Sequence, residues 1–222
     1  MRINEHPDRE ALTLAVAHDI VTSLGMVLRA QDRATLSLPG GSTPVPVFKA
    51  LSAAPLDWDR VTIIPGDERW VPSDHARSNA RLIRRHLLEE GVAADLIDLY
   101  DPALDPDAGA AAASARVAGF LPLSVLLLGM GEDMHTASLF PGAQGLAAAL
   151  AADAAPVLPI RSDTAEEPRV TLTLPVLKGA TEAFLMITGP EKRAALERAA
   201  GLSPEQAPIA GLLRDLTVHY AD

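Results

Sequence analysis

The loop that follows the apolar run Val125–Leu128 holds a dense group of side chains able to transfer protons. Glu132, Asp133 and His135 fall within four residues. A run that is apolar on both faces indicates a buried parallel strand. Ligands of open α/β sheets bind outside the carboxyl ends of such strands, and histidine exchanges protons near neutral pH. We therefore expect this loop to carry chemistry, with His135 activating a water molecule.

A second loop has the composition of a phosphate site. The segment Pro39-Gly-Gly-Ser-Thr-Pro44 joins a short strand to a helix. Gly40 and Gly41 let successive backbone N–H groups converge, and Ser42 and Thr43 add hydroxyls near the helix terminus. The segment lacks the Gly-Lys-Ser/Thr ending of a Walker loop, so a plain tight turn remains an equal alternative.

Charged residues in three further segments are candidates for a binding site because of where they lie. Asp67 and Arg69 follow another strand, where they would orient a substrate or form a solvated salt bridge. Arg169 precedes a Val-Thr-Leu-Thr strand. Lys192 stands in the first turn of a helix, where a cation opposes the dipole unless it faces a bound anion. Taken alone, Lys192 is interpreted as an ordinary exposed lysine.

Other chemistries fit the chain less well. Met134 replaces the third glycine of a dinucleotide fingerprint, which argues against a nicotinamide site. A metal site built from Asp67, Asp133 and His135 is a minority alternative, because no second histidine lies at ligand spacing. Neither a Gly-x-Ser-x-Gly elbow nor a cysteine is present, which disfavours an acyl-enzyme. We expect no metal and no cofactor, and we interpret the remaining histidines as solvated or packed: His6, His18, His75, His86 and His219.

Composition limits the partners. The 222 residues are 48% hydrophobic and 22% charged, which is typical of a globular protein, and the formal net charge is −10. That charge argues against nucleic acid or an anionic membrane as the main partner, but it permits an anionic small molecule held by local cations. The polar start is unlike a signal peptide, and no apolar run approaches the ~20 residues of a membrane span. We expect a cytoplasmic protein, either a monomer or a small homo-oligomer.

The elements that must position these groups alternate between strand and helix. Apolar residues recur every fourth position from Leu12 to Leu28, which predicts a helix over 8–30. We expect a second helix that ends at about residue 52 and a third that begins after a cap at Ser78 or Asn79. Further helices are expected over 107–119, over 145–152 and from 190 onward. Strands are expected at 35–38, 61–64, 97–100, 125–128, 157–160, 170–174 and 183–188. This βα alternation predicts one α/β domain over residues 1–222, with a mainly parallel, doubly wound sheet covered by helices on both faces.

Taken together, several segments resemble the 6-phosphogluconolactonase family. The matching segments occur in the family's order and span about residues 40 to 192: Pro39-Gly-Gly-Ser-Thr-Pro44, Asp67-Glu-Arg-Trp-Val-Pro72 with Ser78-Asn79, Leu128-Gly-Met-Gly-Glu-Asp-Met-His-Thr-Ala-Ser-Leu-Phe-Pro-Gly142, Arg169-Val-Thr-Leu-Thr173 and Gly189-Pro-Glu-Lys192. The family is similar in fold to glucosamine-6-phosphate isomerases and deaminases. The resemblance implies a Rossmann-like domain and hydrolysis of 6-phospho-D-glucono-1,5-lactone in the oxidative pentose phosphate pathway.

The resemblance also implies roles for the residues already singled out. His135 is the expected base, Asp133 orients it, and Arg69 steadies the oxyanion. The substrate phosphate is expected at Gly40, Gly41, Ser42 and Thr43, with Arg169 and Lys192 supplying the compensating charge. Asp67 is the remaining residue expected to contact the phosphorylated sugar lactone.

Two positions distinguish this chain within that resemblance. The family pattern usually has glycine where this chain has Met134, so a positive φ there would strain the methionine. The deaminase relatives carry a glutamate at the position of Phe140, and phenylalanine cannot shuttle a proton to open a sugar ring. Phe140 therefore favours a lactonase. The alternatives are a sugar-phosphate isomerase or deaminase, and a non-catalytic sugar-phosphate sensor, which the absence of an evident helix-turn-helix disfavours.

Overall fold

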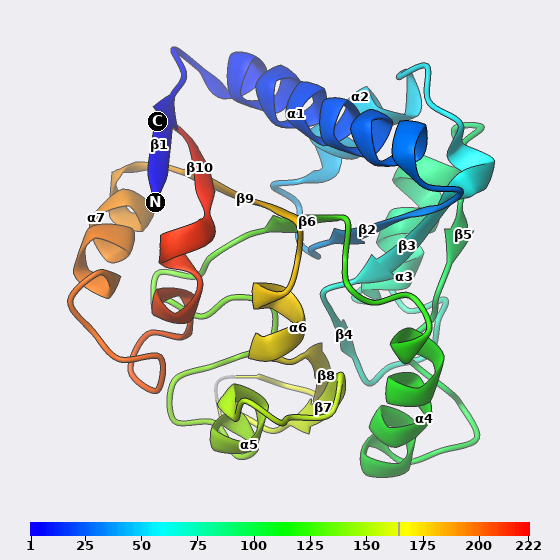
Figure 1. Cartoon of the computed structure of the whole chain (residues 1–222). Helices are drawn as coiled ribbons and strands as arrows, with labels where there is room; N and C mark the ends of the chain where they lie inside the picture. Colours follow the sequence, from blue (N-terminus) through cyan, green and yellow to red (C-terminus); the bar gives the residue numbers. More distant parts are fainter. Residues whose placement is uncertain (164) are drawn as a thin grey trace.

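The computed structural model describes residues 1–163 and 165–222, and within them two β-sheets. The larger sheet has seven strands in the order β1-β10-β9-β6-β2-β3-β5, and all of its neighbouring pairs are parallel (Figure 1). The smaller sheet has antiparallel pairs in the order β4-β8-β7. The strands of the larger sheet are β1 (Arg2–Glu5), β2 (Ala34–Leu38), β3 (Val61–Pro65), β5 (Asp95–Leu96), β6 (Val125–Leu128), β9 (Glu182–Thr188) and β10 (Thr217–Ala221), and those of the smaller are β4 (Asp67–Arg69), β7 (Val157–Ile160) and β8 (Arg169–Leu172).

Helices cover both faces of the larger sheet, as predicted. Buried positions of β6 alternate between them: Val125 and Leu127 face one apolar cluster, while Leu126 and Leu128 face the other. The first cluster includes α1, α2 and α3, and the second includes α4 to α7. The α-helices are α1 (Arg9–Ala30), α2 (Val45–Ser52), α3 (Asn79–Ile83), α4 (Pro106–Ala118), α5 (Leu146–Leu150), α6 (Leu174–Lys178) and α7 (Pro190–Ala199); the short 3-10 segments are η1 (Trp58–Arg60), η3 (Pro208–Gly211) and η4 (Leu213–Asp215), and η2 (Arg84–Leu88) is a π-helix.

The strand order reverses between β2 and β6. Chain order runs outward from β2 through β3 to β5 on one side, and from β6 through β9 to β10 on the other. The segments that leave β2 and β6 therefore diverge at their carboxyl ends. In doubly wound sheets this switch point is the usual ligand site.

Local sequence signals explain where the helices begin. The carboxylate of Asp8 accepts a hydrogen bond from the backbone N of Ala11 at 2.8 Å, so α1 starts at Arg9. Ser78 caps α3 in the same way through the backbone N of Arg81. Gly189 has a φ of 87° immediately before α7, which opens with Pro190. These caps match the positions predicted from the sequence.

The small antiparallel sheet is where the predicted organisation is wrong. Residues 157–160 and 169–172 form strands as expected, but they pair with each other and with β4, outside the parallel sheet. Asp67–Arg69, for which a solvated loop was one of the two interpretations, forms strand β4. The strand predicted up to Leu174 ends at Leu172, because Pro175 lacks an N–H for a β-ladder and suits the first turn of α6.

Three strands of the larger sheet also differ from the prediction. The strand expected at 97–100 lies at Asp95–Leu96, and Ile97 makes one more bond, to the carbonyl of Ile63 at 2.9 Å, before the chain leaves the sheet. The strands β1 and β10 were not predicted. In β1 only one of the four residues is even partly buried, so the strand has no apolar run from which it could be predicted.

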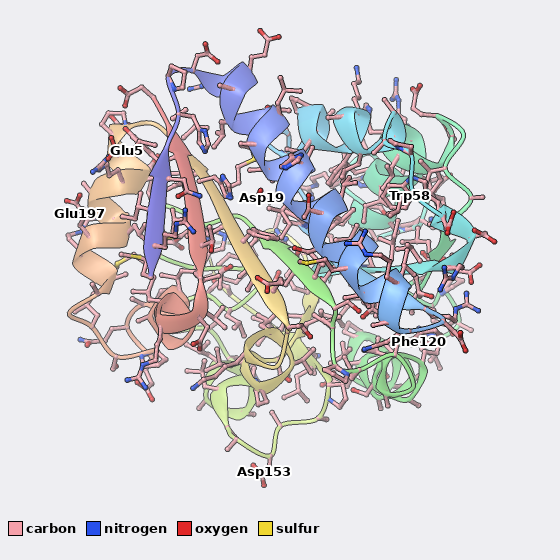
Figure 2. The ribbon with its side chains drawn as sticks, turned by 45° about the horizontal axis from the view of Figure 1, so that its top comes forward. Glu5, Asp19, Trp58, Phe120, Asp153 and Glu197 are labelled. Carbon is pink, nitrogen blue, oxygen red and sulfur yellow. The ribbon has the colours of Figure 1, made fainter. Side chains whose placement is uncertain are left out.

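Helix α1 is long and apolar enough, by length and composition, to cross a membrane, although no continuous apolar run predicted one. Its apolar side chains have another explanation. Leu12, Val16, Ile20 and Leu24 are fully buried in the cluster that packs on the sheet. In Figure 2 the helix lies across the strands. The apolar face of α1 is therefore part of the protein core.

His219 on β10 is packed in the interior, 1% exposed. Its Nδ1 lies 3.0 Å from Nε2 of His6, its Nε2 lies 3.3 Å from the carboxylate of Asp19 on α1, and its ring packs edge-on against Phe184. Burial lowers the pKa of His219 below its ordinary value, even though Asp19 acts in the opposite direction. The folded protein therefore disfavours protonation of this histidine relative to the unfolded chain.

A pH-dependent loss of stability follows. Because the pKa of His219 is depressed on folding, its contribution to stability is complete above the unfolded value of about 6.5 and is lost as pH falls below it, by at most ~1.4 kcal/mol per pH unit. We expect His219→Gln to flatten the pH dependence of the unfolding free energy below pH 6.5, measured by urea denaturation. The control is His18→Gln, at an exposed position of α1. Equal pH slopes in the two variants would contradict this account of His219.

Candidate active site

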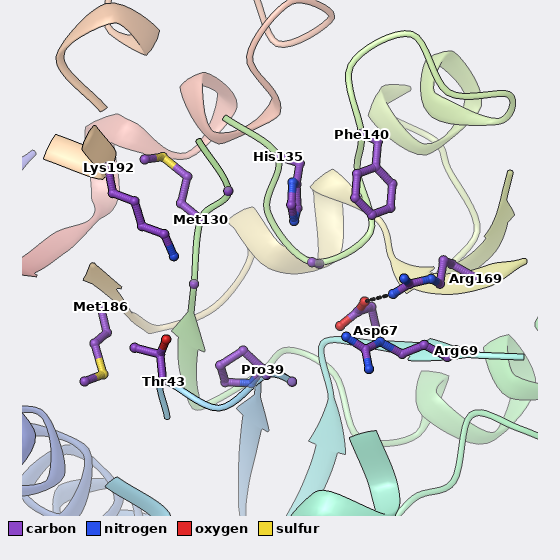
Figure 3. Close-up of a pocket in the computed structure, with 15 residues that line it drawn as sticks. Pro39, Thr43, Asp67, Arg69, Met130, His135, Phe140, Arg169, Met186 and Lys192 are labelled. Atoms are coloured by element: carbon purple, nitrogen blue, oxygen red, sulfur yellow. Dashed lines mark ion pairs between the residues drawn. The ribbon is translucent and has the colours of Figure 1, made fainter. Parts of the chain in front are cut away.

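A cavity of about 410 Å³ opens at the switch point between β2 and β6. Segments distant in sequence converge there: the loop after β2, strand β4, the loop after β6, the start of β8, the end of β9 and the first turn of α7. Figure 3 shows the side chains around the cavity. The lining residues are Pro39, Gly40, Gly41, Thr43, Asp67, Arg69, Gly129, Met130, Gly131, His135, Ala137, Phe140, Arg169, Met186 and Lys192.

His135 lines the cavity and is paired with Asp133. Its Nδ1 lies 2.5 Å from Oδ1 of Asp133, and its backbone N lies 3.3 Å from the same oxygen. The hydrogen bond from the imidazole lowers the pKa of Asp133, so this carboxyl is a carboxylate near neutral pH. A carboxylate that accepts from Nδ1–H leaves Nε2 as the free basic nitrogen of the ring. Asp133 thus orients the imidazole and leaves a basic nitrogen free at the cavity.

Gly131 makes room for this pair. A Cβ at Gly131 would lie 2.3 Å from Nδ1 of His135 and 2.3 Å from Oδ1 of Asp133. The same short turn is closed by two backbone hydrogen bonds of 3.0 Å, from Gly131 N to His135 O and from Met134 N to Gly131 O. The loop thus folds back on itself, and Gly131 lies directly against the side chains of His135 and Asp133.

The backbone on either side of His135 is strained. Met134 has a φ of 68° and Ala137 a φ of 49°, both in the left-handed region that residues with a Cβ rarely adopt. The positive φ anticipated at Met134 is therefore present. Strained residues persist where surrounding contacts determine the conformation. Here Ile209 N donates to Met134 O at 3.3 Å, and Thr136 Oγ1 donates to Gly129 O at 2.9 Å.

The glycine-rich loop contributes backbone to the cavity. Gly40, Gly41 and Thr43 line it, whereas Ser42 lines a smaller neighbouring cavity of about 220 Å³ with Thr43. Gly41 has a φ of 90°, which favours glycine. Gly40 is required by close packing, since a Cβ there would lie 1.9 Å from Oδ1 of Asn79. The loop is therefore held against the start of α3.

Strand β4 divides its side chains between the cavity and the interior. Asp67 and Arg69 line the cavity, while Glu68 between them is fully buried. The Glu68 carboxylate accepts hydrogen bonds from the backbone N of Arg69, Asn79 and Ala80 and from the hydroxyl of Ser78, at 2.7–3.0 Å. Burial nevertheless raises the pKa of Glu68 above its ordinary value. These bonds fix α3 beside β4.

Asp67 connects the walls of the cavity to one another. Its Oδ1 accepts a hydrogen bond from Asn79 Nδ2 at 3.0 Å, and its Oδ2 accepts one from the hydroxyl of Ser138 in the loop after β6. Ser138 is fully buried, and its backbone N also donates to Oγ1 of Thr171 on β8. The sequence indicated Asp67 but gave no signal for the roles of Glu68 and Ser138, because both depend on partners distant in the chain.

Arg69 and Arg169 lie directly opposite each other in the β4–β8 pair. The Arg169 guanidinium lies 3.9 Å from Oδ2 of Asp67, and Arg69 donates to the carbonyl of Arg77. Among residues 1–163 and 165–222, the buried Nε atoms of both arginines have no hydrogen-bond partner, and burial lowers the pKa of Arg169. Like charges directly across a ladder are unfavourable, so this pair is suited to an anion in the cavity.

Lys192 enters the cavity from the other side. It stands in the first turn of α7, and Figure 3 shows it on the same side as Thr43, with His135 between it and the arginines. The two cations that the sequence grouped as phosphate partners, Arg169 and Lys192, therefore approach from opposite sides of His135. The cavity has a cationic group at each end and a base in the middle.

The alternative metal site is not assembled in the described part of the chain. No group of three or more His, Asp or Glu side chains there is arranged to hold a metal ion. Asp67 is bonded to Asn79 and Ser138, while Asp133 is bonded to His135.

Comparisons with known proteins agree with this geometry. The family model described as glucosamine-6-phosphate isomerases/6-phosphogluconolactonase matches residues 7–219. A 6-phosphogluconolactonase of Pseudomonas putida is 39% identical over 218 residues, covering 97% of this chain and 90% of the relative. One from Rhizobium meliloti is 41% identical over 218 residues, covering 96% and 93%.

Solved structures extend the match to three dimensions. The crystal structure of a 6-phosphogluconolactonase from Shewanella baltica superposes with a TM-score of 0.96 at 30% identity, covering 100% of this chain and 98% of the other. That of the Trypanosoma brucei 6-phosphogluconolactonase gives 0.82 at 26% identity, covering 99% and 95%. Matched along nearly its whole length in both sequence and fold, this chain belongs to the 6-phosphogluconolactonase family, within the larger family of glucosamine-6-phosphate isomerases and 6-phosphogluconolactonases.

Proposed function

We propose that the protein hydrolyses 6-phospho-D-glucono-1,5-lactone to 6-phospho-D-gluconate, a step of the oxidative pentose phosphate pathway, by histidine-assisted attack of water. The observation that carries the proposal is the His135–Asp133 pair inside a cavity with cations at both ends. The relatives at about 40% identity carry the name of this activity. The substrate is an uncharged lactone ring attached to a phosphate, which suits such a cavity.

The phosphate binds at the end formed by the glycine-rich loop and Lys192. Backbone N–H groups of Gly40 and Gly41 and the hydroxyl of Thr43 provide donors there, and Ser42 adds a second hydroxyl from the adjoining cavity. Lys192 contributes the compensating charge. A lysine in the first turn of a helix is unfavourable until an anion binds beside it, which explains its position in α7.

The lactone carbonyl lies at the other end, near Arg69 and Arg169. Nε2 of His135 takes a proton from water as the water oxygen attacks the carbonyl carbon, and Asp133 stabilises the imidazolium that forms. Arg69 stabilises the developing oxyanion. Arg169 binds the substrate at this end, and Asp67 holds Arg169 and the loop of Ser138 in place.

The tetrahedral intermediate then collapses with cleavage of the bond to the ring oxygen. The imidazolium of His135 returns its proton to that oxygen, so the product carries a free hydroxyl and a carboxylic acid, which then releases its proton to solvent and becomes a carboxylate. A lactone already reacts with water unaided, so general-base assistance of about 10²–10⁴-fold together with positioning is sufficient. This route uses the side chains of the chain and water alone.

The direct test generates the lactone in situ and follows acid release with and without the protein. Release faster than spontaneous hydrolysis is the expected result. Tight binding of 6-phospho-D-gluconate without turnover would instead favour a sugar-phosphate sensor. Ammonia release from glucosamine 6-phosphate would favour a deaminase.

Removing the imidazole separates chemistry from binding. We expect His135→Ala to lower kcat by about 10²–10⁴-fold, because no other group replaces the base. Binding of 6-phospho-D-gluconate, measured by calorimetry, should remain largely unchanged, since its phosphate contacts lie elsewhere in the cavity. Unchanged turnover in this variant would rule out His135 as the base.

A methyl group at Gly131 should have a similar effect although no ionisable residue is substituted. We expect Gly131→Ala to lower kcat at least 10-fold, because its Cβ would displace both the imidazole and the Asp133 carboxylate. The matched control is Gly119→Ala, where no atom lies within 4 Å of the added Cβ. Wild-type kinetics in Gly131→Ala would contradict the geometry of the pair.

The phosphate end is tested with two substrates. We expect Lys192→Ala to raise KM for the phosphorylated lactone about 10- to 100-fold, with little effect on the slow turnover of unphosphorylated glucono-1,5-lactone. Lys178→Ala, at an exposed position of α6, is the control. An equal loss with both substrates would place Lys192 outside the phosphate site.

A further inference from the structure

Phe140 lies between the base and a buried cation. Its side chain is 8% exposed and belongs to the apolar cluster beneath the cavity, yet it also lines the cavity. Its ring centroid lies 4.5 Å from that of His135, with the two planes tilted by 45°. The Arg169 guanidinium lies 5.9 Å from the same ring. Figure 3 shows Phe140 beside His135 and above Arg169.

The contact matters because His135 is otherwise weakly constrained. Within the described residues, Asp133 is the hydrogen-bond partner of the imidazole, through Nδ1. One hydrogen bond fixes the position of one ring nitrogen but permits rotation about the N···O line, which moves Nε2 relative to a bound substrate. A packed aromatic ring removes that freedom, since the imidazole cannot rotate into it.

The same ring separates two charges during the reaction. When His135 takes a proton, an imidazolium forms near Arg169 of β8 and Arg69 of β4, with Lys192 of α7 on the other side. The opposing charges are Asp133 on its own loop and Asp67 on β4. An aromatic face attracts cations, so Phe140 contacts both the imidazole and the guanidinium favourably while holding them apart.

We propose that Phe140 is a positioning residue for the hydrolysis: its ring fixes the orientation of the His135 imidazole and separates the resulting imidazolium from Arg169. The proposal rests on the function proposed above, in which His135 is the base. It adds a role for a residue that has no proton to transfer.

The test compares variants that keep or remove the aromatic ring. We expect Phe140→Leu to lower kcat about 10- to 100-fold with KM for the phosphorylated lactone within threefold of wild type, because substrate contacts remain and only the base is misoriented. Phe140→Tyr keeps the ring and should remain within threefold for both constants. Phe140→Met, also without a ring, replaces Phe140→Leu if thermal melting shows that the leucine variant is unfolded.

Two further readouts exclude a merely structural effect. The acid limb of the kcat–pH profile should shift to lower pH by about 0.5 unit in Phe140→Leu and stay in place in Phe140→Tyr, because loss of the ring disfavours the imidazolium. In addition, the double variant His135→Ala/Phe140→Leu should be no slower than His135→Ala, since Phe140 acts through the imidazole.

Each contrary result has a distinct meaning. Wild-type kcat and pH profile in Phe140→Leu, or equal losses in the leucine and tyrosine variants, would overturn the role of Phe140 while leaving His135 as the base. Additive losses in the double variant would do the same. Full activity of His135→Ala would instead overturn the proposed function, and the role of Phe140 with it.

Discussion

The divergence of the chain at the carboxyl ends of β2 and β6 is the constraint on which the site depends. Two neighbouring parallel strands that send their connections to opposite sides leave a crevice that no side chain of the sheet can fill. The glycine-rich loop enters it from β2, and the histidine loop enters it from β6. The residues that line the cavity are therefore arranged around the switch point between β2 and β6.

The charges of the cavity come mainly from outside the parallel sheet. The short antiparallel sheet brings Asp67 and Arg69 on one strand and Arg169 on the next to the mouth of the crevice. Buried charge is costly unless it is paired or hydrogen-bonded. Here Glu68 receives four hydrogen bonds behind the cavity, and Asp67 receives bonds from two different walls. Asp67 thus both faces the cavity and connects its walls, whereas Glu68 holds the walls together from behind.

The sequence predicted the parts of the structure that depend on local pattern. The apolar runs predicted the central strands, the helix starts expected at about Asp8 and at Ser78 agree with the structure, and the loop after Val125–Leu128 was expected to pair Asp133 with His135, which it does. It did not predict the separate antiparallel sheet, because a strand's partner cannot be deduced from its own periodicity. For the same reason Arg169 was grouped with Lys192, although the fold brings them to opposite sides of His135.

The pairing of β4 with β8 has a consequence beyond placing two arginines. Because side chains alternate along a strand, a slip of one residue in this short ladder would turn Arg69 and Asp67 into the interior and bring Glu68 to the surface of the cavity. Such a slip would also break the hydrogen bonds of Glu68 and turn two charged side chains inward, so it would cost stability as well as activity. The placement of the cavity's charges therefore depends on a three-residue register that the strands of the larger sheet do not set.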